Sequence, residues 1–218
     1  MNYIMSDLHN DSDRLKEILK KIAFSENDHL FILGDLFDRS EHQPDPLGVY
    51  FTVLSLGERC TVIRGNHDHL LATYIRKYVA TPERKRRQLP LYAYNSFSLL
   101  QEKMTEMDLI CLADWIMAQP LQLEIALGDE RYLLAHAMTA NPMEVKPDEY
   151  YLEGVLDDAY YLEEGIGGYI SVCGHRNMGR GTIWHNAKQN VYMCDCGAGY
   201  CSGKLGCLCL ETKNEFYV

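Results

Sequence analysis

Short apolar runs alternate along the chain with segments whose apolar residues recur at helical spacing. The first run covers residues 3–5, and apolar residues between positions 15 and 22 then recur every three or four residues. That spacing places their side chains on one face of a helix. Asp11 and Ser12 stand just before this segment, and both residue types cap helix N-termini. The opening of the chain therefore predicts a strand, a loop and a helix.

Later apolar runs predict further strands, and most of them end in polar residues. These predicted strands cover residues 30–33, 61–63, 121–127, 132–135, 170–173, 183–184, 191–194 and 205–210. Gly128-Asp129-Glu130 is typical of a hairpin turn. Between positions 70 and 117 the apolar residues are mostly helix-spaced, and Pro82 and Pro90 break the segment. The order predicts an α/β fold with helices outside two packed sheets, in which residues from about 69 to 120 form a helical flank or cap insertion.

Length and charge narrow the class of protein. A chain of 218 residues can build a full hydrophobic core and predicts a single domain over residues 1–218. The formal net charge of −10 disfavours binding to a nucleic-acid backbone, because proteins that grip polyanions are usually basic. No apolar run approaches the roughly 18 residues that span a bilayer, and residues 1–5 hold no basic region before a long apolar stretch. We therefore expect a cytoplasmic protein without a membrane partner.

Polar residues gather where the predicted strands end, and in open α/β sheets ligands bind beyond the carboxyl ends of the strands. In chain order these ends read Asp7-Leu8-His9, Gly34-Asp35-Leu36-Phe37-Asp38-Arg39, Arg64-Gly65-Asn66-His67-Asp68, His136 and Gly174-His175. Carboxylate and imidazole groups together suit Mn, Fe or Zn. One Asp-x-His is common by chance, whereas five ordered clusters are far less so. The pattern predicts a metal site.

The five clusters resemble those of calcineurin-type metallophosphoesterases, and most closely the phosphoprotein phosphatase branch, with its bacterial serine/threonine phosphatases and diadenosine tetraphosphatase-like enzymes. The resemblance covers nearly the whole chain and implies a four-layer α-β-β-α sandwich of two mixed sheets. It also implies two divalent transition-metal ions, whether Mn, Fe or Zn. By the resemblance, the ligands of the first ion are Asp7, His9 and Asp35, and those of the second are Asp35, Asn66, His136 and His175. Asp35 would bridge the pair.

The same resemblance implies hydrolysis of phosphomonoesters by a hydroxide bound to the two metals. His67 would protonate the leaving alkoxide as general acid, and Asp38 would hold its imidazole in the required tautomer. Arg39 and Arg64 would bind phosphate oxygens, because a guanidinium can form two parallel hydrogen bonds, and Asn66 would also contact the substrate. The substrate would be a phosphoserine or phosphothreonine protein or a small phosphorylated molecule. The identity of the metal and the oligomeric state stay open.

Some residues depart from the family pattern. Asn10 and Ser40 stand where Gly is common, and Asp68 stands where Glu is usual. Residues 137–174 contain no Arg, although the family often places a phosphate-binding Arg there. The residues that could replace it are Lys146 and Arg176.

Three further groups of residues have ordinary structural explanations. The cysteines near the C-terminus lack Cys-x-x-Cys spacing, so we expect them to fill the core as small apolar residues; they are Cys194, Cys196, Cys201, Cys207 and Cys209. The basic run of residues 84–87 is typical of a solvated helix face or loop. The tyrosines between positions 150 and 161 are expected to pack against a sheet edge.

Two other functions remain possible. Hydrolysis of a dinucleoside polyphosphate, or of a phosphodiester, fits the same motifs. A non-catalytic metal-binding scaffold is the second alternative, but such proteins usually lose the acid or a ligand. Here His67 and all six predicted ligands are present.

Overall fold

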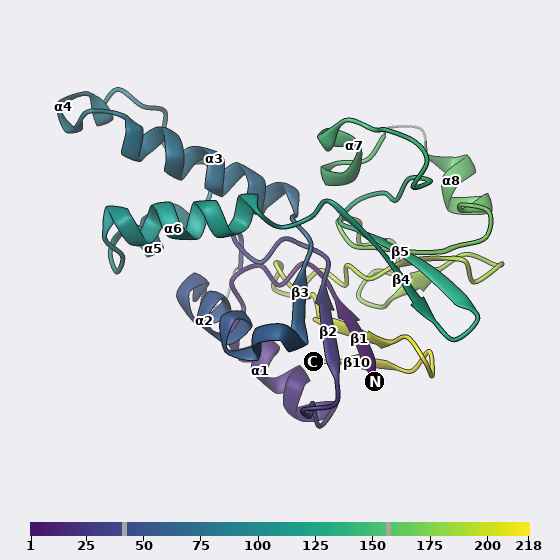
Figure 1. Cartoon of the computed structure of the whole chain (residues 1–218). Coiled ribbons are helices and arrows are strands. Elements are labelled where there is room, and N and C mark those ends of the chain that lie inside the picture. The colour runs from purple at the N-terminus through teal and green to yellow at the C-terminus, as the bar shows by residue number, and fades with distance from the viewer. Residues whose placement is uncertain (41–42, 156–157) are drawn as a thin grey trace.

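Two mixed five-stranded sheets pack against each other in the computed structural model, which describes residues 1–40, 43–155 and 158–218 (Figure 1). The first sheet has the order β10 (Glu215–Tyr217), β9 (Gly206–Cys209), β1 (Asn2–Met5), β2 (His29–Ile32) and β3 (Cys60–Val62). The second has the order β4 (Gln122–Leu127), β5 (Glu130–Ala135), β6 (Ile170–Cys173), β8 (Val191–Met193) and β7 (Trp184–His185). In the first sheet β1, β2 and β3 are parallel up to the edge at β3, and β9 and β10 add antiparallel pairs on the other side. In the second sheet β5, β6 and β8 form a parallel centre, and β4 and β7 are antiparallel edge strands. The predicted α/β fold of two mixed sheets is confirmed.

Alternation along β1 shows how these strands divide the core. Ile4 lies in the cluster between the sheets, whereas Tyr3 and Met5 lie in the cluster that faces helices α1 (Ser12–Lys21) and α2 (Pro46–Leu56). Successive strand residues point to opposite faces, so a run that is apolar throughout is buried on both. Complete burial of one such aliphatic side chain stabilises the fold by about 1.5–3 kcal/mol.

Helices complete the outer layers. α1 begins at the predicted cap, where the Asp11 side chain accepts the N–H of Arg14. On the second sheet, α7 (Asp148–Leu152) and α8 (Ala159–Glu164) contribute Tyr150 and Tyr161 to a small apolar cluster with β6 and β8. No helix in the described part of the chain combines the length and the apolar character needed to cross a membrane.

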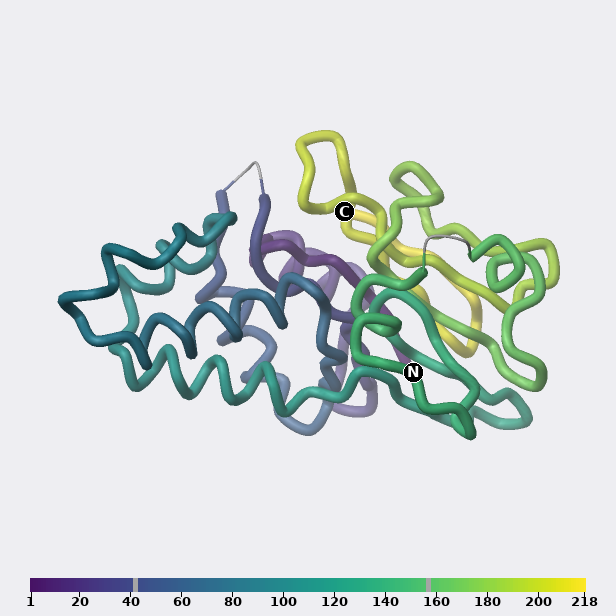
Figure 2. Tube along the Cα trace, turned by 90° about the horizontal axis from the view of Figure 1, so that it is seen from above, coloured from purple at the N-terminus to yellow at the C-terminus, as the bar shows by residue number. Residues whose placement is uncertain are grey.

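A helical arm projects from the sheets. It consists of α3 (Asn66–Ala80), α4 (Glu83–Arg86), α5 (Ser96–Gln101) and α6 (Glu106–Met117), and α3 lies against α6 (Figures 1 and 2). A 3-10 helix at Gly57–Arg59 precedes β3. The segment expected to be a helical flank or cap is thus helical, while its status as an insertion and the single domain over 1–218 stay predictions.

The residue groups with structural explanations mostly lie as expected. Cys194, Cys196, Cys207 and Cys209 are buried in the core, whereas Cys201 is exposed. None of the α4 residues is buried. Tyr161 is buried, but Tyr160 is 78% exposed and does not pack on the sheet.

Candidate metal centre

The loops that follow β1, β2 and β3 are bound to one another at the edge of the first sheet. The backbone N–H of Asp7 donates to Gly34 O over 3.1 Å, and that of His9 donates to Asp35 O over 3.0 Å. Asp7, His9, Asp35 and His175 have positive φ angles between 46° and 64°. Such angles are uncommon for residues other than glycine and cost on the order of 1–3 kcal/mol each, and they cluster at functional sites. The surrounding fold therefore holds these four residues in conformations that they would not adopt alone.

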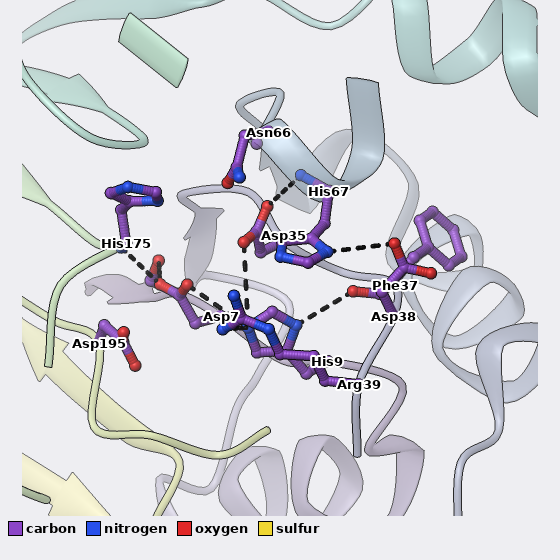
Figure 3. A network of polar contacts seen from close by, with 12 residues as sticks. Asp7, His9, Asp35, Phe37, Asp38, Arg39, Asn66, His67, His175 and Asp195 are labelled. Atoms are coloured by element: carbon purple, nitrogen blue, oxygen red, sulfur yellow. Dashed lines mark hydrogen bonds and ion pairs between the residues drawn. The ribbon is translucent and has the colours of Figure 1, made fainter. Parts of the chain in front are cut away.

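The structure brings the predicted metal ligands into two adjoining groups (Figure 3). Donor atoms of Asp7, His9 and Asp35 lie within 4.8 Å of one another, and so do those of Asp35, His136 and His175. Asp35 belongs to both groups, since its Oδ2 lies 3.9 Å from His9 Nε2 and its Oδ1 lies 3.5 Å from His136 Nε2. His175 Nδ1 is 3.2 Å from His136 Nε2. A carboxylate with one oxygen toward each group has the geometry of a bridging ligand.

Backbone carbonyls orient two of the imidazoles. His9 Nδ1 lies 3.1 Å from Phe37 O, and His136 Nδ1 lies 2.7 Å from Leu33 O. When Nδ1–H donates to a carbonyl, Nε2 keeps a lone pair for a metal ion. The carboxamide of Asn66 lies 2.9 Å from His136 Nε2 and so joins the second group.

The carboxylates of Asp7 and Asp35 have too little positive charge around them in the protein to favour their ionised form. Asp7 and Asp35 are each 1% exposed. Burial raises the pKa of both well above the usual value; Asp195 raises the pKa of Asp7 further, and Asp7 does the same to Asp35. Two carboxyl groups that are buried together stay ionised only beside a cation. Carboxylate and imidazole donors in this arrangement fit divalent transition-metal ions.

The imidazoles are in the form that binds metals. Burial lowers the pKa of His9 to about 3 and that of His175 to about 4, and it lowers the pKa of His136 well below its usual value. The nearby guanidinium groups of Arg39 and Arg176 add to the shifts of His9 and His175, respectively. A neutral imidazole at physiological pH has a free lone pair, so no proton has to be displaced when a metal binds.

The predicted general acid, His67, and its partner, Asp38, lie beside the group formed by Asp7, His9 and Asp35. His67 Nδ1 is 3.1 Å from Asp38 Oδ2, and both side chains are buried. The Tyr92 hydroxyl donates to the same oxygen over 2.5 Å, and the backbone N–H of His67 donates to Asp35 Oδ1 over 2.9 Å. Asp38 thus orients the imidazole, while α3 positions it next to the shared carboxylate. Tyr92 was not anticipated, because it lies in an aperiodic segment after Pro90.

The two predicted phosphate-binding arginines lie differently. Arg39 Nη1 is 3.4 Å from His9 Nε2, so its guanidinium adjoins the metal ligands. Arg64 is 7% exposed; its Nη1 donates to Met117 O over 3.2 Å, and its Nη2 lies 3.5 Å from Asp148 Oδ2. These contacts direct Arg64 toward α6 and α7, so its role in phosphate binding stays a prediction.

Two further carboxylates support the site. Asp68 accepts the backbone N–H groups of Asp35, Leu36 and Gly65 over 2.9, 2.8 and 3.0 Å, and thereby joins two of the loops. Asp195 is 5% exposed and lies beside Asp7 (Figure 3). Asp195 follows β8 closely, so the rule that found the other strand-end residues could also have found it.

The residues proposed to replace the missing arginine are engaged elsewhere. Arg176 forms an ion pair with Asp158 and donates to Val155 O over 3.0 Å, and Lys146 pairs with Glu144 over 2.9 Å. Among the described residues, the groups of His, Cys, Asp and Glu that are close enough to hold a metal contain no cysteine. The expectation that the C-terminal cysteines fill the core holds for Cys194, Cys196, Cys207 and Cys209, and it is wrong for the exposed Cys201.

Relatives with named activities are similar over part of the chain. A symmetrical bis(5'-nucleosyl)-tetraphosphatase of Hamiltonella defensa is 33% identical over 138 residues, which are 62% of this chain and 43% of that protein. A protein of the same name from Serratia proteamaculans is 42% identical over 74 residues, or 33% of this chain and 25% of its own. The chain therefore spans less than half the length of these curated relatives.

Solved structures share the fold over the whole chain. One, provisionally assigned as a diadenosine tetraphosphatase, has a TM-score of 0.73 at 19% identity and aligns with 100% of this chain and 92% of its own. A serine/threonine phosphatase from Saccharomyces cerevisiae has a TM-score of 0.58 at 12% identity, with coverage of 100% and 78%. At these identities the likeness concerns the fold alone.

The family itself is shown by a match that extends over most of the chain. The model of the calcineurin-like phosphoesterases matches residues 3–203, which include all five strand-end clusters. The resemblance found in the sequence is confirmed, and this chain belongs to the calcineurin-like phosphoesterase family.

Proposed function

We propose that this chain is a metal-dependent hydrolase of phosphoesters. The observation that carries the proposal is the position of Asp35, whose two oxygens face two separate groups of buried donors. Two divalent ions would outweigh the charge of the two buried carboxylates, Asp7 and Asp35, and leave a positive floor that attracts phosphate even in an acidic protein. When bound, the ions would also supply Lewis acidity and lower the pKa of water at the site.

The chain's own residues would complete the reaction. His67, held by Asp38 at 3.1 Å, would donate a proton to the leaving oxygen. Arg39, which lies next to the metal ligand His9, would bind a phosphate oxygen. These roles are supported by the contacts of the two side chains, and both residues follow metal ligands within a few positions in the sequence.

A second candidate function is hydrolysis of a dinucleoside polyphosphate. Its support is that the curated relatives are named as symmetrical bis(5'-nucleosyl)-tetraphosphatases. A nucleotide substrate also agrees with the net charge of −10, because a small anion needs only the local positive floor, whereas a nucleic-acid backbone would need an extended basic surface. Phosphoserine and phosphothreonine proteins remain the other proposed substrates.

The test is phosphate release from O-phosphoserine and p-nitrophenyl phosphate, and ADP formation from diadenosine tetraphosphate, in the presence of Mn²⁺. We expect His67→Asn to lose hydrolysis by about 10²-fold or more while it still binds Mn²⁺. The matched surface variant is Asp114→Asn, whose side chain is 60% exposed, and it should keep full activity. If the wild type bound metal but hydrolysed none of the three substrates, the scaffold alternative would replace the proposal.

A further inference from the structure

An open pocket of about 530 Å³ adjoins the metal centre, and tyrosines form two parts of its wall. The pocket is lined by residues of three loops, among them Arg39, Ser40, Tyr94 and Tyr200. Pockets of 300–1,000 Å³ are typical of small-molecule sites. The volume therefore suits one part of a small organic ligand.

Contacts connect the pocket to the residues of the proposed reaction. The Tyr94 ring stacks edge-on against His67, with the ring centroids 4.5 Å apart. Arg39 lies between the metal ligands and the pocket, since its Nη1 is 3.4 Å from His9 Nε2 and its guanidinium carbon is 5.5 Å from the centre of the Tyr200 ring. A ligand with phosphate at the metal centre would extend directly into this pocket.

The two rings are accessible, and hydrogen bonds anchor the loop that carries Tyr94. Tyr94 is 38% exposed and Tyr200 is 48% exposed. Asn95, which follows Tyr94, donates through its side chain to Arg39 O and accepts a hydrogen bond of 3.1 Å from Asn10. Aromatic rings on a fixed wall suit the stacking of a flat heterocycle, because every nucleobase has a π face.

The polar side chains of the wall offer little to a ligand. Ser40 is 8% exposed, and its Oγ, which has no hydrogen-bond partner among the described residues, is itself closed to solvent. The Asn95 side chain is already bonded to Arg39 O and to Asn10. Recognition by this wall is therefore by stacking on the two tyrosine rings.

We propose that this pocket binds the base of a nucleotide substrate, with Tyr94 and Tyr200 as stacking residues. The inference rests on the proposed function, because that function places the phosphate at the metal centre. The pocket adds residues that would distinguish a nucleotide from a phosphate ester without a base.

The test compares binding of AMP and ribose 5-phosphate by calorimetry, since these ligands differ in the base. Both are phosphomonoesters that the active protein would hydrolyse, so the titrations use the Mn²⁺-loaded protein and its variants in the His67→Asn background. We expect AMP to bind at least tenfold more tightly. Tyr200→Leu and Tyr94→Leu should each remove most of that ratio, and Tyr200→Phe should keep it. Tyr160→Leu is the matched control, because Tyr160 is 78% exposed on α8, and it should leave the ratio unchanged.

Three outcomes would overturn the inference. The first is equal affinity for AMP and ribose 5-phosphate, and the second is a ratio that both leucine variants retain. The third is an affinity ratio of phosphotyrosine to phosphoserine that is as large as the ratio of AMP to ribose 5-phosphate, because the pocket would then accept any aryl group. Hydrolysis is measured separately on the wild type: a protein that hydrolyses none of the three test substrates, while its pocket binds AMP in the expected way, refutes the proposed function and leaves the pocket assignment intact.

Discussion

Replacement of Asp38 by Asn tests whether the carboxylate beside His67 supports its role as general acid. His67 Nδ1 lies 3.1 Å from Asp38 Oδ2, and the residues are 2% and 0% exposed. Unit charges at that separation attract by roughly 5 kcal/mol at an effective dielectric constant of about 20. Asn keeps an acceptor for the imidazole N–H but removes the charge. The charged imidazolium is the form that carries the proton to be donated. Loss of even half of the attraction would disfavour this form and slow the reaction by about 10²-fold, which lies within the usual range for general acids.

The leaving group makes this prediction specific. An alkoxide such as that of O-phosphoserine requires a proton, whereas p-nitrophenolate is a weak base and leaves nearly unaided. We therefore expect Asp38→Asn to lower kcat about 10²-fold for O-phosphoserine and less than about tenfold for p-nitrophenyl phosphate. Tyr92→Phe, which removes only the 2.5 Å hydrogen bond to Asp38, should show the same trend with smaller losses.

Steady-state kinetics on both substrates, with thermal unfolding as a check on folding, would measure the effect. Asp114→Asn on the surface of α6 serves as the control for the chemical change. Equal losses on the two substrates would refute the role of Asp38 and His67 in proton donation, and so would an unchanged kcat for O-phosphoserine.

Other predictions concern stability and access. Burial raises the pKa of the Asp7 and Asp35 carboxyl groups, so the metal-free protein loses stability as the pH rises above their unfolded pKa of about 4. A chelator should therefore lower Tm more at pH 8 than at pH 5, and equal decreases in Tm at the two pH values would contradict this. Gly174→Ala would place a methyl group against Asp7 and should weaken Mn²⁺ binding at least tenfold, whereas Gly167→Ala meets open space and should not. Thiol titration of the native protein should find two fast groups, Cys111 and Cys201, a slower one at half-buried Cys60, and the five buried thiols only after unfolding. More than three reactive thiols in the native protein would show that the core is looser than described.

Most of the metal centre could be predicted because parallel strands place their carboxyl ends at one edge. Asp7 and Asp35 follow β1 and β2 within three residues, and His136 directly follows β5, so chain order was enough to group them. The positive φ angles that aim these side chains could not be predicted, since non-glycine residues give no local signal for them. These angles depend on hydrogen bonds between distant loops, such as those accepted by Asp68.

The elements that were missed are those whose formation depends on tertiary contacts. α2 carries apolar residues on all sides, which leaves almost no helical period, although Asp45 caps it and Pro46 opens it. β10 is a three-residue strand that pairs only with β9. Tyr94 and Tyr200 come from loops about 100 residues apart in sequence, so only the folded chain shows that they line one pocket.

Direct measurement of metal stoichiometry tests the central claim that six side chains hold a pair of ions around Asp35. Mn²⁺ is titrated by calorimetry into chelator-treated wild type, Asp35→Asn and the exposed hairpin-turn control Asp129→Asn. The account predicts two Mn²⁺ per chain in the wild type and in Asp129→Asn, and less than one in folded Asp35→Asn. Two ions bound by Asp35→Asn, or none bound by the wild type, would contradict it.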